Sequence, residues 1–412
     1  MSKLQELIQR LCPDGVEYKK LGEVLEYEQP TKYIVKSTEY DDSYSIPVLT
    51  AGQSFILGYT NEQKGVFDAS KDNPVIIFDD FTTSFHWVDF PFKIKSSAMK
   101  MLRPKDDSIN FKYIHYAMQC IGFVPGEHTR YWISKYSMFT IPVPPLEVQE
   151  EIVRILDRFD VYAAELQAEL QARKEQYEYY RNLLLTFNPA GCAGEADDEQ
   201  EGCVTTRGGH SYPIQWKTMG EVGTFIRGNG LQKKDFTESG VGCIHYGQIY
   251  TYYGTFTTET KSFVSEEFAK KLRKAQTGDL VIATTSENVE DVGKAVVWLG
   301  KDEIAISGDA YVYKHNQNPR YIAYLLQTDR FLAFKRMNVS GTKVTRISGD
   351  SLAKYPIPIP PLELQEKIVA ILDRFETLVN DLSEGLPAEI AAVKEQYEYY
   401  RNRLLTFKEK TA

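Results

Sequence analysis

The sequence predicts an α+β protein in which two similar α/β globules alternate with two long helices. Three internal repeats carry this prediction. KEQYEYYRNLLLTF from Lys174 returns as KEQYEYYRNRLLTF from Lys394, with thirteen of fourteen residues identical. IPVPPLEVQEEIVRILDRFD from Ile141 is matched by IPIPPLELQEKIVAILDRFE from Ile357, and VEYKKLGEV from Val16 by IQWKTMGEV from Ile214. The chain order is therefore globule, helix, globule, helix.

The repeats divide the chain into five segments. We predict a first globule at 1–145, a first helix at 146–187, an acidic glycine-containing linker at 188–211, a second globule at 212–361 and a second helix at 362–412. If each globule starts where the preceding helix ends, the two helices must run antiparallel. The expected result is a coiled-coil spine with approximate two-fold symmetry.

Both helices are predicted from apolar residues that recur every three or four positions after a proline cluster. Residues 146–187 contain no Gly or Pro and would extend about 63 Å at 1.5 Å per residue. The second helix contains Gly385 and Pro387, where it is expected to break or restart. The side chains predicted to form the coil or a subunit interface are Ile152, Ile155, Leu156, Phe159, Leu166, Leu170, Tyr177, Tyr180, Ile368, Ile371, Leu372, Phe375, Tyr397 and Tyr400.

Composition limits the class of protein and its compartment. Of the 412 residues, 42% are hydrophobic, and no apolar run approaches the roughly 18 residues of a membrane span. The five cysteines are scattered without a CxxC pair, which suits a reducing cytoplasm and argues against a zinc site. The net charge of −9 predicts weak DNA affinity for the chain alone, although residues 211–361 carry 19 basic against 15 acidic side chains.

No catalytic motif is found in the sequence. Neither VGKA from Val292 nor LGKD from Leu299 completes a phosphate-binding GxxxxGK[ST] loop. The Pro-Pro pairs lie in VPPL and IPPL, which is not the motif of amino-methyltransferases. ETK from Glu259 and EYK from Glu17 match the end of a nuclease motif, but such triplets are common. We therefore expect a chain that catalyses nothing and binds no metal or cofactor itself.

Two related globules attached to long helices are suited to recognising two different sites along one linear ligand, and DNA is the natural candidate for that ligand. Residues shared by the globules should be framework or contact phosphates, whereas residues that differ in matching loops should read bases. The candidate DNA-binding residues are Thr82, Thr83, Ser84, His86, Trp87, Lys93, Lys95, Lys100, Arg103, Thr284, Thr285, Ser286, Asn288, Lys343 and Arg346. The alternative for most of them is an ordinary solvated surface position.

This order of globules and repeated motifs resembles the specificity subunit of type I restriction–modification enzymes, over nearly the whole chain. CPDGVEYKKLGEV from Cys12 resembles the usual opening of that family. The resemblance implies that 1–145 and 212–361 are target recognition domains, each of which binds half of a split double-stranded DNA site. It also implies partners, namely two methyltransferase and two restriction subunits, and assigns S-adenosylmethionine, ATP and Mg²⁺ to them. A coiled-coil scaffold without DNA specificity is the alternative class.

The first helix also contains a tetrapeptide repeat, AAEL then QAEL over 163–170, that yields a test. Inserting one more QAEL after Leu170 would lengthen the helix by about 6 Å and rotate it by about 40°, which nearly preserves the leucine stripe. We expect the spacer between the half-sites to grow by about one or two base pairs, at about 3.4 Å each, while both half-sites stay the same. Genome-wide mapping of methylated sites measures this, and an unchanged spacer with full activity would contradict it.

Overall fold

The chain folds into two compact units, each of which contains one globule and parts of the long helices. The computed structural model describes residues 3–50, 52, 54–187, 201–205, 211–341 and 343–410, with the backbone alone at 201–205 and 211. The first unit comprises Met1–Gln167 and Glu389–Ala412, and the second comprises Ala168–Ala388.

The first globule is built on small sheets. Its strands are β1 (Glu17–Lys20), β2 (Leu25–Glu28), β3 (Ile46–Leu49), β4 (Ile56–Thr60), β5 (Val75–Asp79), β6 (Phe85–Val88), β7 (Lys93–Ile94), β8 (Met99–Pro104) and β9 (Thr140–Val143). Its helices are α1 (Lys3–Leu11), α2 (Leu21–Val24) and α3 (Phe111–Met118), with 3-10 turns η1 (Thr31–Tyr33) and η2 (Tyr136–Met138). The strand orders are β2-β8-β5-β6, β4-β3-β7 and β1-β9. The central strand β5 is buried on both faces from Val75 to Phe78.

The second globule repeats this plan with additional strands. Its strands are β10 (Glu201–Thr205), β11 (Ser211–Thr218), β12 (Gly223–Arg227), β13 (Val241–Ile244), β14 (Phe256–Thr257), β15 (Ser262–Val264), β16 (Lys274–Ala275), β17 (Leu280–Ala283), β18 (Thr285–Ser286), β19 (Ala295–Trp298), β20 (Ile304–Ile306), β21 (Ala310–His315), β22 (Thr345–Arg346) and β23 (Pro356–Ile359). Its helices are α5 (Met219–Val222), α6 (Tyr246–Thr251), α7 (Glu266–Ala269), α8 (Pro319–Leu325), α9 (Asp329–Asn338) and α10 (Gly349–Ala353), with the 3-10 turn η3 (Lys233–Asp235). The largest sheet has the order β12-β21-β17-β19-β14.

The predicted linker at 188–211 needs a correction where the structure describes it. The backbone of 201–205 forms strand β10, which pairs antiparallel with β11, and β11 pairs in turn with β23. The end of the predicted linker is therefore part of a three-stranded sheet. The remainder of the prediction, 188–200 and 206–210, lies outside the described residues.

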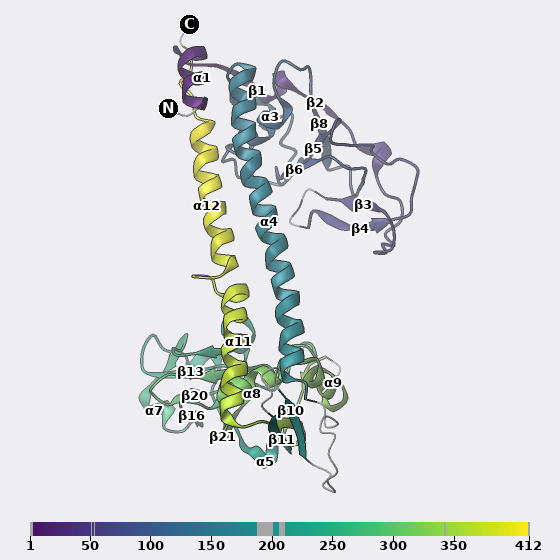
Figure 1. Ribbon diagram of the computed structural model, residues 1–412. Helices are drawn as coiled ribbons and strands as arrows, with labels where there is room; N and C mark the ends of the chain where they lie inside the picture. The colour runs from purple at the N-terminus through teal and green to yellow at the C-terminus, as the bar shows by residue number, and fades with distance from the viewer. Residues whose placement is uncertain are drawn as a thin grey trace. The chain divides into compact units, whose positions relative to one another are not determined.

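The first long helix is continuous, whereas the second is broken. Helix α4 runs without interruption over Leu146–Leu185 (Figure 1). The second segment forms α11 (Leu362–Asn380) and α12 (Leu386–Leu404), separated by five residues. At the break, the Asp381 side chain accepts hydrogen bonds from the backbone of Ser383 and Glu384, and a Cβ on Gly385 would lie 2.4 Å from a backbone oxygen. The helix expected over 362–412 is thus two helices, and the break precedes Pro387.

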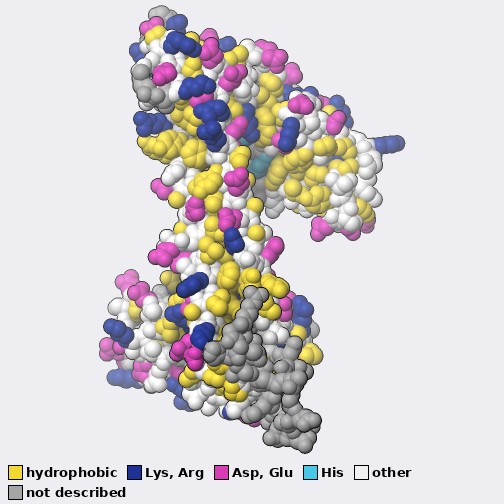
Figure 2. All heavy atoms as spheres, in the orientation of Figure 1, with side chains coloured by type: hydrophobic (Ala, Val, Ile, Leu, Met, Phe, Trp, Pro, Cys, Tyr) yellow, Lys and Arg dark blue, Asp and Glu magenta, His cyan; other side chains and the backbone are white. Residues whose placement is uncertain are grey.

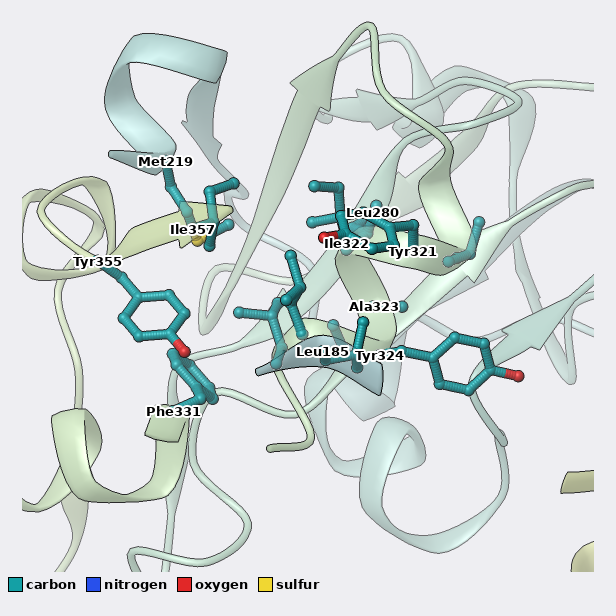
Figure 3. Close-up of a cluster of buried hydrophobic side chains, with 14 of the residues drawn as sticks. Leu185, Met219, Leu280, Tyr321, Ile322, Ala323, Tyr324, Phe331, Tyr355 and Ile357 are labelled. Atoms are coloured by element: carbon teal, nitrogen blue, oxygen red, sulfur yellow. The ribbon is translucent and has the colours of Figure 1, made fainter. Parts of the chain in front are cut away.

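Each globule packs against one face of the first turns of its own long helix. In the first unit Val148, Ile152 and Leu156 of α4 are completely buried in the core beneath α3. In the second unit α11 contributes Leu364, Ile368 and Leu372 to the corresponding core. Leu185, at the end of α4, is inserted there too, beside Tyr324 and Ala323 of α8 (Figure 3).

Within each unit, α4 also packs against the second helical segment. In the first unit the ring of Phe159 lies 6.2 Å from that of Tyr397 and 5.8 Å from that of Tyr400. Further along α4, the Tyr162 hydroxyl donates to Glu389 at 2.6 Å, so α4 and α12 are antiparallel there. In the second unit Phe375 of α11 stacks on Tyr177 and on Tyr180, at 6.3 and 5.6 Å.

A buried glutamine fixes the start of each helix to its globule. Gln149 accepts a hydrogen bond from Asn110 N at 2.9 Å and donates one to the carbonyl of Pro144 at 2.6 Å. Gln365 makes the same pair in the second unit, from Asn318 N at 3.0 Å and to Pro360 at 2.8 Å. These side chains satisfy backbone groups that proline and a helix start leave unpaired.

A tyrosine on the globule's helix makes the second repeated connection. Tyr113 donates to the carbonyl of Pro142 at 3.0 Å, and Tyr321 donates to that of Pro358, also at 3.0 Å. One turn later, Tyr116 lies between the carboxylates of Asp157 and Asp160, at 2.5 and 2.6 Å. The two units therefore share one hydrogen-bonded framework between globule and helix.

The glutamine contacts predict a matched stability effect in the two units. Gln149→Ala and Gln365→Ala should each lower the free energy of unfolding by about 2–4 kcal/mol, because a buried N–H and a buried C=O both lose their partner. Urea denaturation of the purified chain measures this. Gln171→Ala, which removes only an exposed contact to Glu175, should change it by less than about 0.5 kcal/mol. Equal effects at all three positions would contradict the framework role.

Candidate nucleic-acid interface

The predicted contact residues of the first globule lie on the turn between β5 and β6. Asp79 organises this turn, since its carboxylate accepts the N–H groups of Phe81 and Thr82 at 2.8 and 2.9 Å. Thr83 has a φ of +60° and is buried, while Thr82 is exposed. A β-branched residue in the left-handed region costs roughly 1–2 kcal/mol, so this turn is held in shape by its surroundings.

In the second globule the structure brings two predicted groups together. Strand β18 pairs with β22, so that Thr285 lies opposite Arg346 and Ser286 opposite Thr345. Ile347 N also donates to the carbonyl of Thr284 at 3.1 Å. Ser340 forms an antiparallel bridge with Arg346. Lys343, Arg346 and Asn288 are exposed, and the Asn288 amide donates to Asp291 at 2.8 Å.

His86 and Trp87 have a different position from the one expected. Both are half-buried on β6, beyond the turn. The Trp87 ring packs on Phe111 at 5.0 Å and on His115 at 5.6 Å, beneath α3. His86 lies 4.6 Å from the ring of Phe55. These contacts fit a packing role better than base reading.

The prediction that Lys93 and Lys100 bind DNA needs a correction, because both side chains lie in the interior of the globule. Lys93 is 2% exposed, pairs with Glu62 at 3.2 Å and donates to the carbonyl of Lys64 at 2.6 Å. Lys100 is 1% exposed and pairs with Asp80 at 3.2 Å. A buried charged group is stable only when it is paired with an opposite charge. Each of these lysines therefore pairs with an acidic residue inside the globule and cannot contact a phosphate.

Lys95 and Arg103 are also engaged within the globule. Both are half-buried. The Lys95 ammonium donates to the hydroxyl of Tyr40 at 3.2 Å, and the Arg103 guanidinium lies 4.9 Å from the ring centre of Phe67. The basic cluster of 93–105 is therefore largely structural, which its sequence does not reveal.

Sequence reasoning missed His128 and Arg130. Both are exposed, and they belong to the segment that precedes Ile133. The structure places the His128 ring parallel to that of Phe81 at 4.5 Å, next to the β5–β6 turn. The internal repeat could have indicated these two residues. ISKYSM from Ile133 matches ISGDSL from Ile347, so the segment before Ile133 corresponds to the segment that contains Lys343 and Arg346.

The residues predicted for the coil occupy several environments. Those that are buried, or half-buried and packed into a core or against a partner ring, are Ile152, Ile155, Leu156, Phe159, Leu166, Leu170, Tyr177, Ile368, Leu372, Phe375 and Tyr397. Tyr180 and Tyr400 are 36% and 42% exposed, although each contacts a phenylalanine ring. Ile371 is 44% exposed and is not packed in a core, so its place at the coil or a subunit interface stays a prediction.

Two features are absent from the described part of the chain. None of its helices has the length and apolar character needed to cross a membrane. Over the same ranges, no group of three or more His, Cys, Asp or Glu side chains could hold a metal ion.

Comparison with known proteins defines the class. The family model described as the type I restriction modification DNA specificity domain matches twice, at residues 13–175 and 213–392. The two matches cover both globules and much of the helical segments. The chain therefore belongs to this family and carries two copies of its specificity domain.

Particular relatives extend the match to full length. The specificity subunit of the type I restriction enzyme EcoR124I/EcoR124II of Escherichia coli is 38% identical over 99% of this chain and 98% of its own. A chain from a structural study of complex assembly and conformational transition of the type I R-M system has a TM-score of 0.54 at 18% identity, over 96% and 98% of the two chains. The S subunit of M. genitalium has a TM-score of 0.50 at 14% identity, over 95% and 96%. These two structures share the fold.

The environment of His115 predicts a pH effect on stability. Burial, with smaller contributions from Lys112 and His86, lowers the pKa of this imidazole to about 3. In the unfolded chain it titrates near pH 6.5, so the unfolded state binds more protons between these values. The free energy of unfolding should therefore fall as the pH is lowered through about 6.5 toward 3.

The repeat supplies a matched variant for this test. Ala323, 1% exposed, takes the place of His115 in the second globule. His115→Ala should lower stability at neutral pH through the cavity it leaves, while reducing the loss of stability between pH 7 and pH 4. Thermal unfolding across that range measures both effects, and an unchanged pH dependence would contradict the role given to His115.

Proposed function

We propose that this chain is the DNA sequence-specificity subunit of a type I restriction–modification complex. Each globule reads one half of a bipartite double-stranded target, and the helical segments set the spacer and dock the partner subunits. The globules are then target recognition domains mounted on the repeated glutamine and tyrosine contacts. Membership of the DNA specificity family and 38% identity to a specificity subunit over nearly the full length support this proposal.

One observation carries the proposal, namely a shared framework with different residues at matching loops. The buried connections from Gln149 and Gln365 to the backbone are the same in both units. The exposed segments beside the central strands instead carry His128 and Arg130 in one unit and Lys343 and Arg346 in the other. A reader of two different half-sites needs this combination, because framework fixes register while loop side chains discriminate bases.

The tyrosine repeats are suited to two equivalent docking contacts. The first tyrosine of each repeat, Tyr177 or Tyr397, faces its own unit, whereas Tyr179 and Tyr399 are 63% and 57% exposed. Exposed aromatic side chains are common anchors of protein interfaces. We infer that each repeat docks one methyltransferase subunit, to which a restriction subunit adds, giving two of each.

Charge and chemistry assign the remaining tasks to those partners. With a net charge of −9, and with basic and acidic side chains interspersed on the visible face (Figure 2), the chain alone should bind DNA weakly. We propose that it catalyses nothing, that S-adenosylmethionine, ATP and Mg²⁺ bind to the partners, and that the complex works in the cytoplasm. Methyl transfer from S-adenosylmethionine by the purified lone chain would contradict this.

Domain exchange tests the proposed division of labour. Replacing residues 16–140 by the equivalent domain of another specificity subunit should change one half-site and leave the other half-site and the spacer as they were. The reason is that base-reading loops move with the globule, whereas the helices remain. Sequencing of methylated sites in a host that carries the cognate methyltransferase measures this.

The reciprocal exchange of residues 216–356 is the control, and it should change only the other half-site. A change in both half-sites from a single exchange would refute modular reading. A chain that supports no sequence-specific methylation with any methyltransferase partner would favour the scaffold alternative.

A further inference from the structure

Two segments of the first globule meet at one exposed edge. The first is the β5–β6 turn, where Thr83 N donates to the carbonyl of Asp79 at 2.9 Å in addition to the contacts of the Asp79 carboxylate. The second is the segment 124–132, which approaches the same turn. Trp132 N donates to the carboxylate of Asp80 at 2.7 Å, and Tyr131 N donates to the carbonyl of Asp80 at 2.8 Å. The second segment is therefore attached directly to the end of the central strand.

The second segment is also closed on itself. The Tyr131 hydroxyl donates to the carbonyl of Glu127 at 2.7 Å and accepts from Glu127 N at 2.9 Å. Between these points lie His128 and Arg130, both exposed. A short loop fixed at both ends presents its side chains with little loss of conformational entropy on binding.

Phe81 connects the two segments and positions both side chains. Its ring is stacked on that of His128, with centres 4.5 Å apart and planes 16° apart. The Arg130 guanidinium lies 5.9 Å from the same ring centre. Among the described residues, the Arg130 side chain makes no ion pair or hydrogen bond, so its donors are free for a ligand.

The second globule builds the same juxtaposition from other residues. Alignment of Ile133 with Ile347 puts 127–132 opposite 341–346. There β22, which follows Lys343 in the chain, pairs with Thr285 and Ser286 of β18, the counterparts of Thr83 and Ser84. The position of the segment is conserved between the units, whereas its exposed side chains differ.

We propose that Arg130 and His128, supported by Phe81, are the base-reading side chains of the first globule. This inference rests on the proposed function and specifies its site. The planar guanidinium of Arg130 fits the O6 and N7 acceptors of a guanine in the major groove, and His128 presents a ring edge to the neighbouring base. Lys93 and Lys100 are not available for this role, because they are paired inside the globule.

The experiment maps methylated sites for the complete complex with its methyltransferase. Arg130→Ala should relax one base position of one half-site, with discrimination there reduced about 10- to 100-fold, and should leave the other half-site unchanged. Arg130→Lys should relax the same position, because an ammonium cannot form the paired contact. His128→Ala should relax an adjacent position of the same half-site.

Lys71→Ala is the matched control. Lys71 is exposed and precedes β5, whereas the reading edge follows β5, so the motif should stay the same. If Arg130→Ala lowers methylation equally at all sites without changing the motif, Arg130 contacts only phosphate and the proposal is wrong. If Arg130→Lys keeps full discrimination, the paired guanidinium contact is wrong.

If a variant complex loses methylation completely, its discrimination is measured by binding instead. The affinity of the complex is compared among duplexes that each carry one base change in the half-site. Discrimination retained at every position would overturn the proposal, and its loss at one position would support it. If instead the unmodified complex methylates no defined sequence, the proposed function fails, which is a separate outcome.

Discussion

The junction between each globule and its long helix is the constraint on which the rest of the structure depends. In each unit a strand is followed by a proline pair and then by the long helix. The backbone N–H and C=O groups at this junction need hydrogen-bond partners. Gln149 and Gln365, 1% and 0% exposed, supply both the donor and the acceptor that the junction requires. Because one face of the first three turns of the helix is buried in the globule's core, the direction of the helix and the packing of the globule are fixed together.

This rigid junction separates stability from recognition. The residues that hold the globule on its helix are buried, hydrogen-bonded and repeated, so changing them costs folding free energy. The exposed side chains beside β5 and β18, such as Arg130 and Lys343, lie outside the core and can differ between the units. Even the strained Thr83 is retained by contacts of its turn with Asp79, which keeps an exposed edge in one shape. New recognition can then arise without rebuilding the fold.

The candidate site was predictable in outline, but the choice among charged residues was not. The internal repeat located the matching segments at Thr83 and Thr285, and the same repeat contained the signal for Arg130. Lys93 and Lys100 looked like surface charges, since a sequence does not show that Glu62 and Asp80 lie within 3.2 Å of them in the interior. Pairing across the fold decides whether a cation faces DNA or the core, and these pairs span 31 and 20 residues.

The sequence by itself determined the two-fold repetition, the mixed α and β class and the helical segments, because these follow from local periodicity and from copied motifs. It also indicated a weak point near Gly385. Only the tertiary structure decided that Ile371 is exposed, that 201–205 form a strand, and that His128 stacks on Phe81. The physical reason is that local propensity acts over a few residues, whereas burial and pairing depend on partners that the chain brings together only when it folds.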